Sequence, residues 1–291
     1  MPGLSSVLPI NPQIVAVVVL YRMTADESPS FHSIQACRAA TPELASAYEV
    51  MVWDNTPGER ASLSDFAGHY VHDGSNPGLA AAYNAALAHA TERGAPWLLL
   101  LDQDTVVTEQ FLAEALSLSQ TSRAGVLVPR LTWQGRTLSP FRPIIVGPPV
   151  PLEDSVLGEW HEPLQAFNSG AVFSVQQLQQ AGGFDSDFPI DYLDHATFTR
   201  LQSRGGRIHV LHARLEHALA SQAPGPLSDG ALRRERDILA GEQRYFRKYG
   251  TTEEKRLFKI RLLRRAASVL FHKHDLRNAT MILKTVLGLT P

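Results

Sequence analysis

The sequence has 291 residues, of which 44% are hydrophobic and 19% are charged. This composition is typical of a globular protein with a large core, in one α/β domain or one domain with an appendage. The single cysteine, Cys37, excludes an internal disulfide and fits a reducing compartment. We recognise no signal peptide and no run of about 18 apolar residues, so we expect a cytoplasmic protein.

The charge is unevenly distributed along the chain. The formal net charge is −2, yet the part from Glu242 onward holds 12 basic and 4 acidic residues, or +8. The rest holds 15 of the 27 basic and 25 of the 29 acidic residues, or −10. A basic tail on an acidic body indicates an anionic partner for the tail, such as a membrane surface or another subunit. The acidic body and the lack of a known module argue against nucleic-acid binding.

Strand and helix patterns alternate through the first 120 residues. We expect strands at 14–21, 49–54, 69–72 and 97–101, and helices at 29–40, 79–92 and 109–119. This alternation predicts a mostly parallel sheet with helices on both faces. Ligands bind at the carboxyl ends of the strands in such sheets. Polar clusters follow three of the predicted strands, at 54–56, 73–76 and 102–104.

The second half of the chain is less regular. Residues 132–163 are rich in proline and poor in periodicity, which predicts a long loop region of functional importance. A strand at 171–175, a helix ending near 204 and a strand at 207–211 are expected to complete the main domain. A Pro-Gly-Pro sequence at 224–226 marks a boundary before further helices. We therefore predict one domain over 1–222 and a C-terminal helical extension over 223–291.

Two carboxylates two residues apart, Asp102 and Asp104, directly follow the apolar run at 97–101. Such a pair can converge on one hard cation, and Mg²⁺ or Mn²⁺ held there can bridge a diphosphate leaving group. Because D-x-D is common by chance, the two residues are alternatively simple turn residues before the next helix. Their position after a buried strand favours the metal site.

The helix predicted at 79–92 begins in a motif that carries polar groups. Asn76 and Pro77 suit the cap and first turn of a helix, but Asn84 is a polar residue inside an apolar helix. A helix start also favours a nearby anion. Asp54, at the end of the second strand, is either part of an Asx turn or an acceptor for a nucleotide base or ribose.

Asp191 and Asp194 begin the helix that ends near residue 204. A carboxylate at this position, facing the cleft of the metal site, is a candidate general base for an acceptor hydroxyl. The structural alternative is that Asp191 caps the helix and Asp194 complements its dipole.

These clusters, in this order, resemble family 2 glycosyltransferases of the GT-A fold over residues 14 to 220, and the rhamnosyltransferase group in particular. That group has an L-D-Q-D-S/T sequence, an N-x-G-x-A-x-A-x-N helix start, a Ser-Gly pair, and the motifs G-x-F-D and F-I-D-Y-x-D. These correspond here to 101–105, 76–84, Ser169-Gly170, 183–185 and 188–194. The resemblance implies an α/β fold with a GT-A type, Rossmann-like mixed sheet flanked by helices.

The resemblance also implies a role for each site residue. Asp54 would contact the nucleoside, and Asp102 and Asp104 would lie at the diphosphate, with Asp104 the favoured direct metal ligand. The remaining donor-site residues would be Asn76, Gly78, Asn84 and Gln103. Asp194 would be the base, because Arg200 lies six residues later as the family pattern expects, and Asp191 would assist at the catalytic site. His217 would complete the metal site, with His212 as its competitor.

The sequence departs from the family pattern at two places. Where the family continues D-x-E-W, Asp194 is followed here by His195-Ala196-Thr197-Phe198, beside the expected acceptor. Asn168 replaces the commoner serine before Ser169. Neither change removes a predicted catalytic group, but the first leaves the acceptor and donor open.

The expected reaction is a metal-dependent, inverting transfer of a sugar, with dTDP-L-rhamnose favoured as donor by the resemblance and UDP-hexoses as the alternative. The acceptor would be a hydroxyl of a glycan or a polyprenyl-linked glycan in bacterial cell-surface polysaccharide synthesis. A nucleotidyltransferase would carry an early glycine-rich phosphate loop, which is absent at 20–23. A non-catalytic glycan-binding or scaffold relative would have lost one of the three key aspartates.

The helix predicted at 253–270 carries two apolar stripes. One comprises Leu257, Ile260, Leu263, Ala267 and Leu270, and the other Phe258, Leu262, Ala266 and Val269. One stripe is expected to pack on the catalytic domain while the other meets a membrane or a second subunit. Burial within a helical subdomain is the equal alternative. The membrane alternative would place the protein peripherally at the inner face of the cell membrane.

Overall fold

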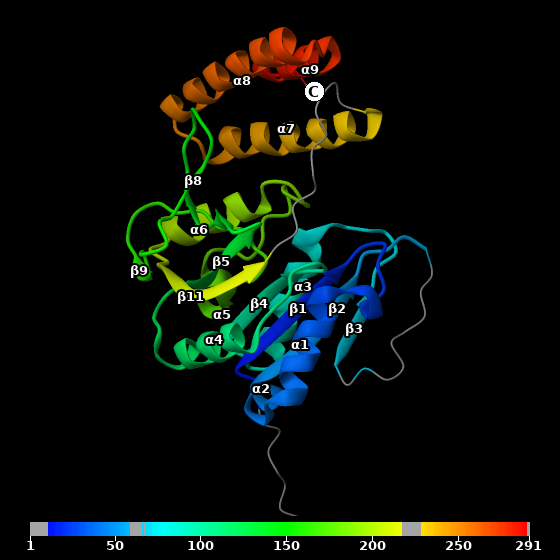
Figure 1. The fold of residues 1–291 in the computed structure, drawn as a ribbon, viewed down its shortest axis with the longest axis vertical. Helices are drawn as coiled ribbons and strands as arrows, with labels where there is room; N and C mark the ends of the chain where they lie inside the picture. Colours follow the sequence, from blue (N-terminus) through cyan, green and yellow to red (C-terminus); the bar gives the residue numbers. More distant parts are fainter. Residues whose placement is uncertain (1–10, 59–65, 67, 217–227, 290–291) are drawn as a thin grey trace, which may run out of the picture.

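The computed structural model describes residues 11–58, 66, 68–216 and 228–289, and its centre is a mixed sheet (Figure 1). The described strands form a nine-stranded sheet, with β6 (Arg136–Ser139) paired on β5 outside the main path. The order across the sheet is β3 (His69–His72), β2 (Tyr48–Asp54), β1 (Ile14–Leu20), β4 (Trp97–Asp102), β10 (Val172–Ser174), β5 (Val126–Trp133), β11 (Ile208–Glu216) and β9 (Gly158–Trp160). The predicted α/β fold with a mixed sheet is confirmed.

The register of the parallel strands brings two predicted site residues to one edge. Strand β1 lies between β2 and β4, and it is buried along its whole length. Asp54 of β2 is level with Leu20, and Asp102 of β4 is level with Val19. The carboxyl ends of β2 and β4 therefore present their aspartates on either side of β1.

Side chains alternate along each strand, so the apolar strands have an apolar side chain on both faces of the sheet. Helices cover both of these faces. Val15, Val17 and Val19 of β1 pack into the core under α3 (Leu79–Glu92), α5 (Val175–Gln180) and α6 (Leu193–Ser203). The alternate β1 residues pack into a second core under α1 (Pro29–Ala40), α2 (Pro42–Ala47) and α4 (Glu109–Thr121). A short 3-10 turn, η1 (Ala25–Glu27), precedes α1.

The region predicted as a loop contains more structure than its sequence indicates. Besides β6 and β9 it forms a small antiparallel pair, β7 (Phe141–Arg142) and β8 (Val150–Pro151). Strands β7 and β9, with residues between 143 and 149, form one wall of a cavity described below. Arg130 of β5, whose side chain is 1% exposed, holds this region by donating to the carbonyl of Leu152 at 3.2 Å and to that of Glu153 at 2.7 Å.

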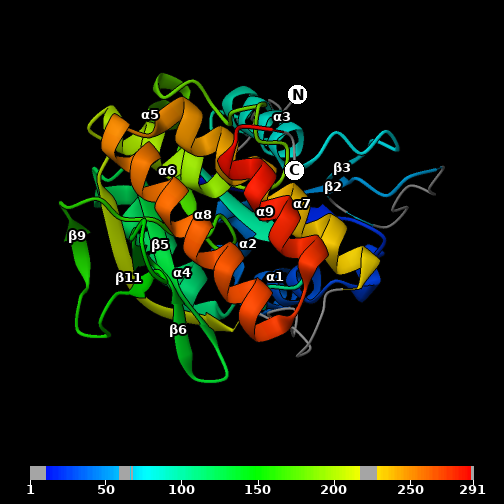
Figure 2. The same cartoon turned by 90° about the horizontal axis from the view of Figure 1, so that it is seen from above.

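Three helices form a layer above the sheet domain in Figures 1 and 2: α7 (Asp229–Tyr249), α8 (Thr252–Lys273) and α9 (Leu276–Val286). They share an apolar cluster of their own. The predicted boundary between 222 and 223 lies outside the described residues. Of the helices that the structure describes, none is long and apolar enough to cross a membrane.

The two predicted stripes of α8 have different environments. Phe258, Leu262, Ala266 and Val269 are all buried in the cluster shared with α7 and α9. Leu263 and Leu270 of the other stripe are exposed by 48% and 38%. One stripe therefore packs within the helical layer rather than on the sheet domain, and part of the other faces solvent.

Candidate active site

The loop after β4 places two carboxylates at the carboxyl edge of the sheet. Its backbone is fixed by buried hydroxyls: Ser169 Oγ accepts from the backbone N–H of Asp102 at 3.0 Å and pairs with Thr105 Oγ1 at 2.7 Å. Ser30 Oγ donates to the carbonyl of Thr105 at 2.7 Å. Because side chains from distant elements anchor the loop, the positions of Asp102 and Asp104 are preorganised.

Gln103, between the two carboxylates, fastens the loop to the N-terminal region. Its Oε1 accepts from the backbone N–H of Tyr21 at 2.8 Å, and its carbonyl accepts from Ser28 Oγ at 2.7 Å. These contacts give Gln103 a positioning role. Its predicted contact with the donor stays a prediction.

Asp104 is half-buried, and no residue in the described parts of the chain hydrogen-bonds to its carboxylate or forms an ion pair with it. The described residues also contain no group of three His, Cys, Asp or Glu side chains arranged for a metal ion. Predicted ligand His217 lies outside the described residues. Its competitor His212 donates from Nδ1 to Glu114 Oε1 at 2.9 Å on α4 and is exposed.

Asp54 is almost completely buried at the end of β2. Its Oδ1 accepts from the backbone N–H of Thr56 at 2.8 Å, and its Oδ2 accepts from the Tyr70 hydroxyl at 3.2 Å. The first contact is the Asx turn that the sequence suggested. Asp54 therefore shapes the turn at 54–56. Its predicted contact with a nucleoside stays a prediction.

The start of α3 packs tightly against the segment before α6. Asn76 has a φ of 51° and Gly78 a φ of 92°, so the chain turns sharply into the helix. A Cβ built on Gly78 would lie 2.5 Å from the carbonyl oxygen of Pro189. The same oxygen accepts from the backbone N–H of Ala80 at 3.1 Å. Only glycine allows this approach, which links the predicted donor helix to the region of the predicted base.

The polar residue inside the apolar helix, Asn84, has partners 100 residues away in sequence. Its Nδ2 donates to the carbonyl of Phe184 at 2.8 Å, and its Oδ1 accepts from the N–H of Phe184 at 2.9 Å. Both ends of the amide are thus engaged with backbone of the G-x-F-D motif. This gives Asn84 a structural role, and its predicted donor contact stays a prediction.

The two aspartates before and in α6 have different partners. Asp191 Oδ2 accepts from Arg234 Nη1 of α7 at 2.5 Å. Asp194 Oδ1 accepts from the backbone N–H of His195 at 2.8 Å and from its Nδ1 at 2.9 Å, and no described residue donates to Asp194 Oδ2. The N-cap of α6 is Tyr192, with a φ of 64° and no side-chain cap, so Asp191 does not cap the helix.

Tyr83 connects the D-x-D loop with the predicted base, a role that the sequence analysis did not assign. Its hydroxyl donates to Asp102 Oδ1 at 3.1 Å. Burial, together with the nearby carboxylates of Asp102 and Asp194, raises the pKa of Tyr83 well above its usual value. Tyr83 therefore stays protonated, and the two predicted functional carboxylates lie within electrostatic reach of one phenol. The residue stands inside the recognised helix motif, which is the signal that would have identified it.

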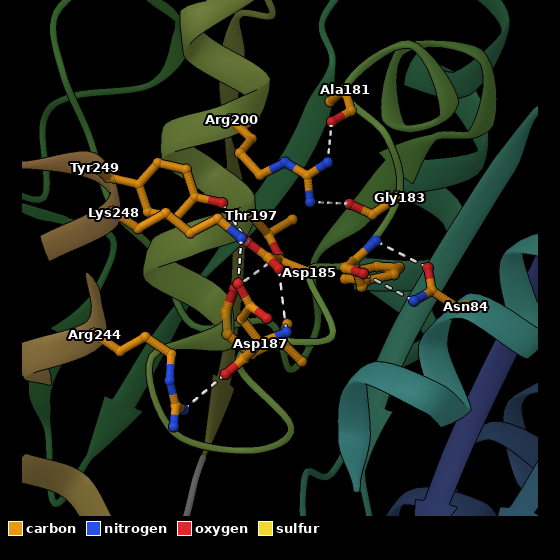
Figure 3. Close-up of polar contacts among 12 residues, drawn as sticks. Asn84, Ala181, Gly183, Asp185, Asp187, Thr197, Arg200, Arg244, Lys248 and Tyr249 are labelled. Atoms are coloured by element: carbon orange, nitrogen blue, oxygen red, sulfur yellow. Dashed lines mark hydrogen bonds and ion pairs between the residues drawn. The ribbon is translucent and has the colours of Figure 1, made fainter. Parts of the chain in front are cut away.

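The G-x-F-D motif fastens α7 to the sheet domain (Figure 3). Asp185 forms an ion pair with Lys248 Nζ at 2.7 Å and accepts a hydrogen bond from the Tyr249 hydroxyl. Arg200 of α6 donates to the carbonyls of Ala181 and Gly183 at 2.5 and 3.2 Å. Burial alone would raise the pKa of the Asp185 carboxyl, but the hydrogen bonds from Lys248 and Tyr249 hold that pKa below its usual value.

We expect Asp185→Ala to lower the free energy of unfolding by about 1–3 kcal/mol, because it removes a buried carboxylate that accepts hydrogen bonds from Lys248 and Tyr249. The matched control is Asp187→Ala, whose 57% exposed carboxylate also contacts Lys248 but should contribute less than about 1 kcal/mol. Because the folded pKa of Asp185 is depressed, its contribution is present above the usual pKa and is lost as the pH falls through the folded value. Urea unfolding at neutral and acid pH measures both. Equal losses for the two variants at neutral pH would contradict the role of Asp185 in fastening α7 to the sheet domain.

Known proteins resemble this chain both in sequence and in fold. Residues 32–165, which include both carboxylates of the D-x-D loop, match Glycosyl transferase family 2. The matched segment has the sequence pattern of a family 2 glycosyltransferase. The dTDP-rhamnosyl transferase RfbF of Shigella flexneri is 24% identical over 221 residues, covering 74% of this chain and 72% of that protein. The predicted class, a glycosyltransferase resembling rhamnosyltransferases, is confirmed.

Solved structures extend the likeness beyond residue 165. A crystal structure of S. aureus TarS residues 1–349 superposes with a TM-score of 0.53 at 14% identity, covering 95% of this glycosyltransferase and 92% of that chain. The same fragment in complex with UDP-GlcNAc gives a TM-score of 0.56 at 14% identity, covering 96% and 82%. At this identity the likeness concerns the fold alone.

Proposed function

We propose that this glycosyltransferase moves a sugar from a nucleotide donor to an acceptor hydroxyl with inversion at the anomeric carbon. The observation that carries this proposal is the pairing of the D-x-D loop with Asp194 around Tyr83. The acceptor oxygen attacks the anomeric carbon while its proton passes to Asp194, and the bond from that carbon to the diphosphate oxygen breaks. A single displacement of this kind requires one base and no covalent sugar intermediate.

The donor set of the D-x-D loop fits Mg²⁺ or Mn²⁺. Mg²⁺ usually takes one or two carboxylates and completes its shell with water and substrate phosphates, so a third protein ligand is not required. Asp104, whose carboxylate is engaged by no described residue, is the proposed direct ligand, and Asp102 the second. When bound, the metal would neutralise the departing diphosphate.

For the donor we propose dTDP-L-rhamnose, because the relative from Shigella flexneri is named a dTDP-rhamnosyl transferase and covers most of the chain. The alternative is a UDP-hexose, since the TarS fragment of the same fold forms a crystal complex with UDP-GlcNAc. Calorimetric titration of dTDP and UDP, each with Mn²⁺ and with EDTA, tests this choice. Metal-dependent binding of dTDP in preference to UDP is expected, and the reverse preference would overturn the proposed donor.

We further propose that the outer face of α8 and α9 rests on an anionic membrane, where a lipid-linked glycan acceptor in polysaccharide synthesis would lie. Figures 1 and 2 show both helices in the outer layer. Exposed apolar side chains include Phe271 (71%) on α8, Leu276 (68%) on α9 and Leu287 (74%) directly after α9. Arg264 and Lys284 are exposed and form no ion pair within the described residues. Apolar side chains with basic neighbours are typical of peripheral membrane helices.

Flotation with vesicles tests this proposal. We expect the protein to float with phosphatidylglycerol vesicles and less with pure phosphatidylcholine. Phe271→Glu should weaken binding roughly tenfold or more, because burying one Phe contributes about 1.5–3 kcal/mol. The control is Leu157→Glu, which changes a 39% exposed leucine outside the helical layer. A protein that stays unbound, or that forms a dimer through Phe271 instead, would contradict membrane binding.

A further inference from the structure

A cavity of about 580 Å³ lies between the sheet domain and the helical layer. The segment around β7–β9, helix α6, and helices α7 and α8 all contribute to its walls. The lining residues that matter here are Trp160, Gln165, His195, Thr199, Tyr245 and Arg261. The volume is in the range of small-molecule sites, about 300–1,000 Å³. None of the donor-site residues predicted from the sequence lines it.

Two residues that line this cavity each hold a buried polar atom with no partner among the described residues: Trp160 Nε1, a donor, and Gln165 Oε1, an acceptor. Gln165 is 4% exposed, and its amide is held in place because Nε2 donates to Thr199 Oγ1 at 3.2 Å. Thr199 Oγ1 in turn pairs with the Tyr245 hydroxyl at 2.7 Å. Buried polar groups are normally paired, so an orphaned donor and an orphaned acceptor on two residues that line one cavity indicate a ligand with hydroxyl groups.

The walls beside these polar groups are aromatic. The Tyr192 ring lies 4.7 Å from the ring of His195 and 5.7 Å from that of Tyr245, measured between centroids. Trp160 carries Arg142 over its ring at 5.2 Å. Apolar walls with a few placed polar groups are the usual environment of a small bound molecule.

The charges in the cavity disfavour an anionic ligand. Arg261 is paired with Glu242, and Arg207 with Glu159 at 3.0 Å. The carboxylates of Glu162 and Glu254 also line the cavity. Both lining arginines are paired with carboxylates, so no unpaired arginine or lysine among the described lining residues is left for a phosphate. An uncharged molecule is therefore favoured.

The cavity adjoins the proposed base through His195. The ring of His195 lines the cavity, and its Nδ1 donates to Asp194 Oδ1 at 2.9 Å. The ring of Tyr245 lies 5.8 Å from that of His195, measured between centroids. Burial raises the pKa of Tyr245, and the nearby carboxylates of Glu254 and Asp194 raise it further, although its contact with Thr199 acts against this. A hydroxyl group at this end of the cavity would lie next to His195, whose ring is hydrogen-bonded to the proposed base.

We infer that this cavity binds the acceptor, and that the part it holds is an uncharged sugar rather than a phosphate group. The inference rests on the proposed function, because Asp194 is taken as the base. Trp160 Nε1 and Gln165 Oε1 bind two sugar hydroxyls, and the tyrosines contact the apolar face of the ring. Any phosphate of a lipid-linked acceptor then lies outside the cavity.

The test is saturation-transfer NMR with the methyl glycosides of rhamnose, glucose, galactose and N-acetylglucosamine, each beside the corresponding sugar 1-phosphate. We expect at least one methyl glycoside to bind, and its 1-phosphate to bind at least tenfold more weakly. Gln165→Leu should weaken glycoside binding at least tenfold. The matched control is Gln179→Leu, a glutamine on α5 that bonds to Thr91 away from the cavity.

Calorimetry with nucleoside diphosphate and Mn²⁺ is carried out in parallel. It distinguishes failure of the acceptor cavity from failure of the proposed function. Intact nucleotide binding with no binding of any methyl glycoside would overturn the cavity assignment alone. Tighter binding of the 1-phosphates, or glycoside binding that survives Gln165→Leu, would overturn it as well. If Gln165→Leu does not fold, Trp160→Phe removes the orphaned donor while keeping an aromatic ring, and the same loss is expected. Absent nucleotide binding in the wild type would instead count against the proposed function.

Discussion

Replacing Asp104 with asparagine is expected to lower sugar-nucleotide turnover by about 100- to 1,000-fold, the size of effect usual for one group that stabilises developing charge. The substitution keeps the shape of the side chain but removes the negative charge that would hold the metal at the leaving diphosphate. Release of nucleoside diphosphate with Mn²⁺ measures the loss. The melting temperature should change little, because no residue in the described parts of the chain pairs with Asp104.

The control for this variant is Asp237→Asn, a 57% exposed carboxylate on α7. It should leave turnover unchanged. Adding EDTA to the wild type should reproduce the loss seen in Asp104→Asn, and adding EDTA to the variant should cost little more. An Asp104→Asn enzyme that keeps full, EDTA-sensitive activity would show that the metal is held elsewhere.

Replacing Asp194 with asparagine is expected to lower transfer to an acceptor by about 10²–10⁴-fold, the usual contribution of a general base. Asparagine can still accept from the backbone N–H of His195, so the start of α6 should be preserved. The loss should appear in kcat for transfer, while calorimetric binding of nucleoside diphosphate stays unchanged. A loss confined to donor binding would contradict the role of base.

The comparison variant is Asp191→Asn, because both aspartates are predicted catalytic residues. The structure gives Asp191 an ion pair with Arg234 of α7, whereas Oδ2 of Asp194 has no described donor. We therefore expect Asp191→Asn to reduce transfer much less than Asp194→Asn. The opposite order would make Asp191 the base.

The core of the sheet could be predicted because its strands carry a simple pattern. The runs at 14–20 and 97–101 are continuously apolar, as strands buried on both faces must be. Parallel strands align their carboxyl ends, so the meeting of Asp54 and Asp102 around β1 followed from alternation alone.

Strand β5 could not be predicted in this way, because Pro129 and Arg130 interrupt its apolar pattern. Arg130 is tolerated at 1% exposure because carbonyls at 152 and 153 accept its hydrogen bonds, and their proximity exists only in the folded chain. The inserted strand β10 has only three residues, too few for a periodic signal.

The candidate site also combines residues that local motifs predict with contacts that only the folded chain creates. The motifs predicted which carboxylates matter, but not that Asn84 is engaged by the backbone of Phe184 or that Tyr83 joins Asp102. The acceptor cavity is assembled from β-segments and three helices spread over 120 residues, between Phe141 and Arg261. No local pattern carries such a site, since its parts meet only through tertiary packing.

The most direct test of this account is the release of nucleoside diphosphate from dTDP-rhamnose and a panel of UDP-sugars, with Mn²⁺ or Mg²⁺ and then with EDTA. Slow hydrolysis reports donor use before the acceptor is known. We expect metal-dependent release from one donor, dTDP-rhamnose, and loss of that release in Asp104→Asn. No release from any donor, together with no calorimetric binding of dTDP or UDP in the presence of metal, would contradict it.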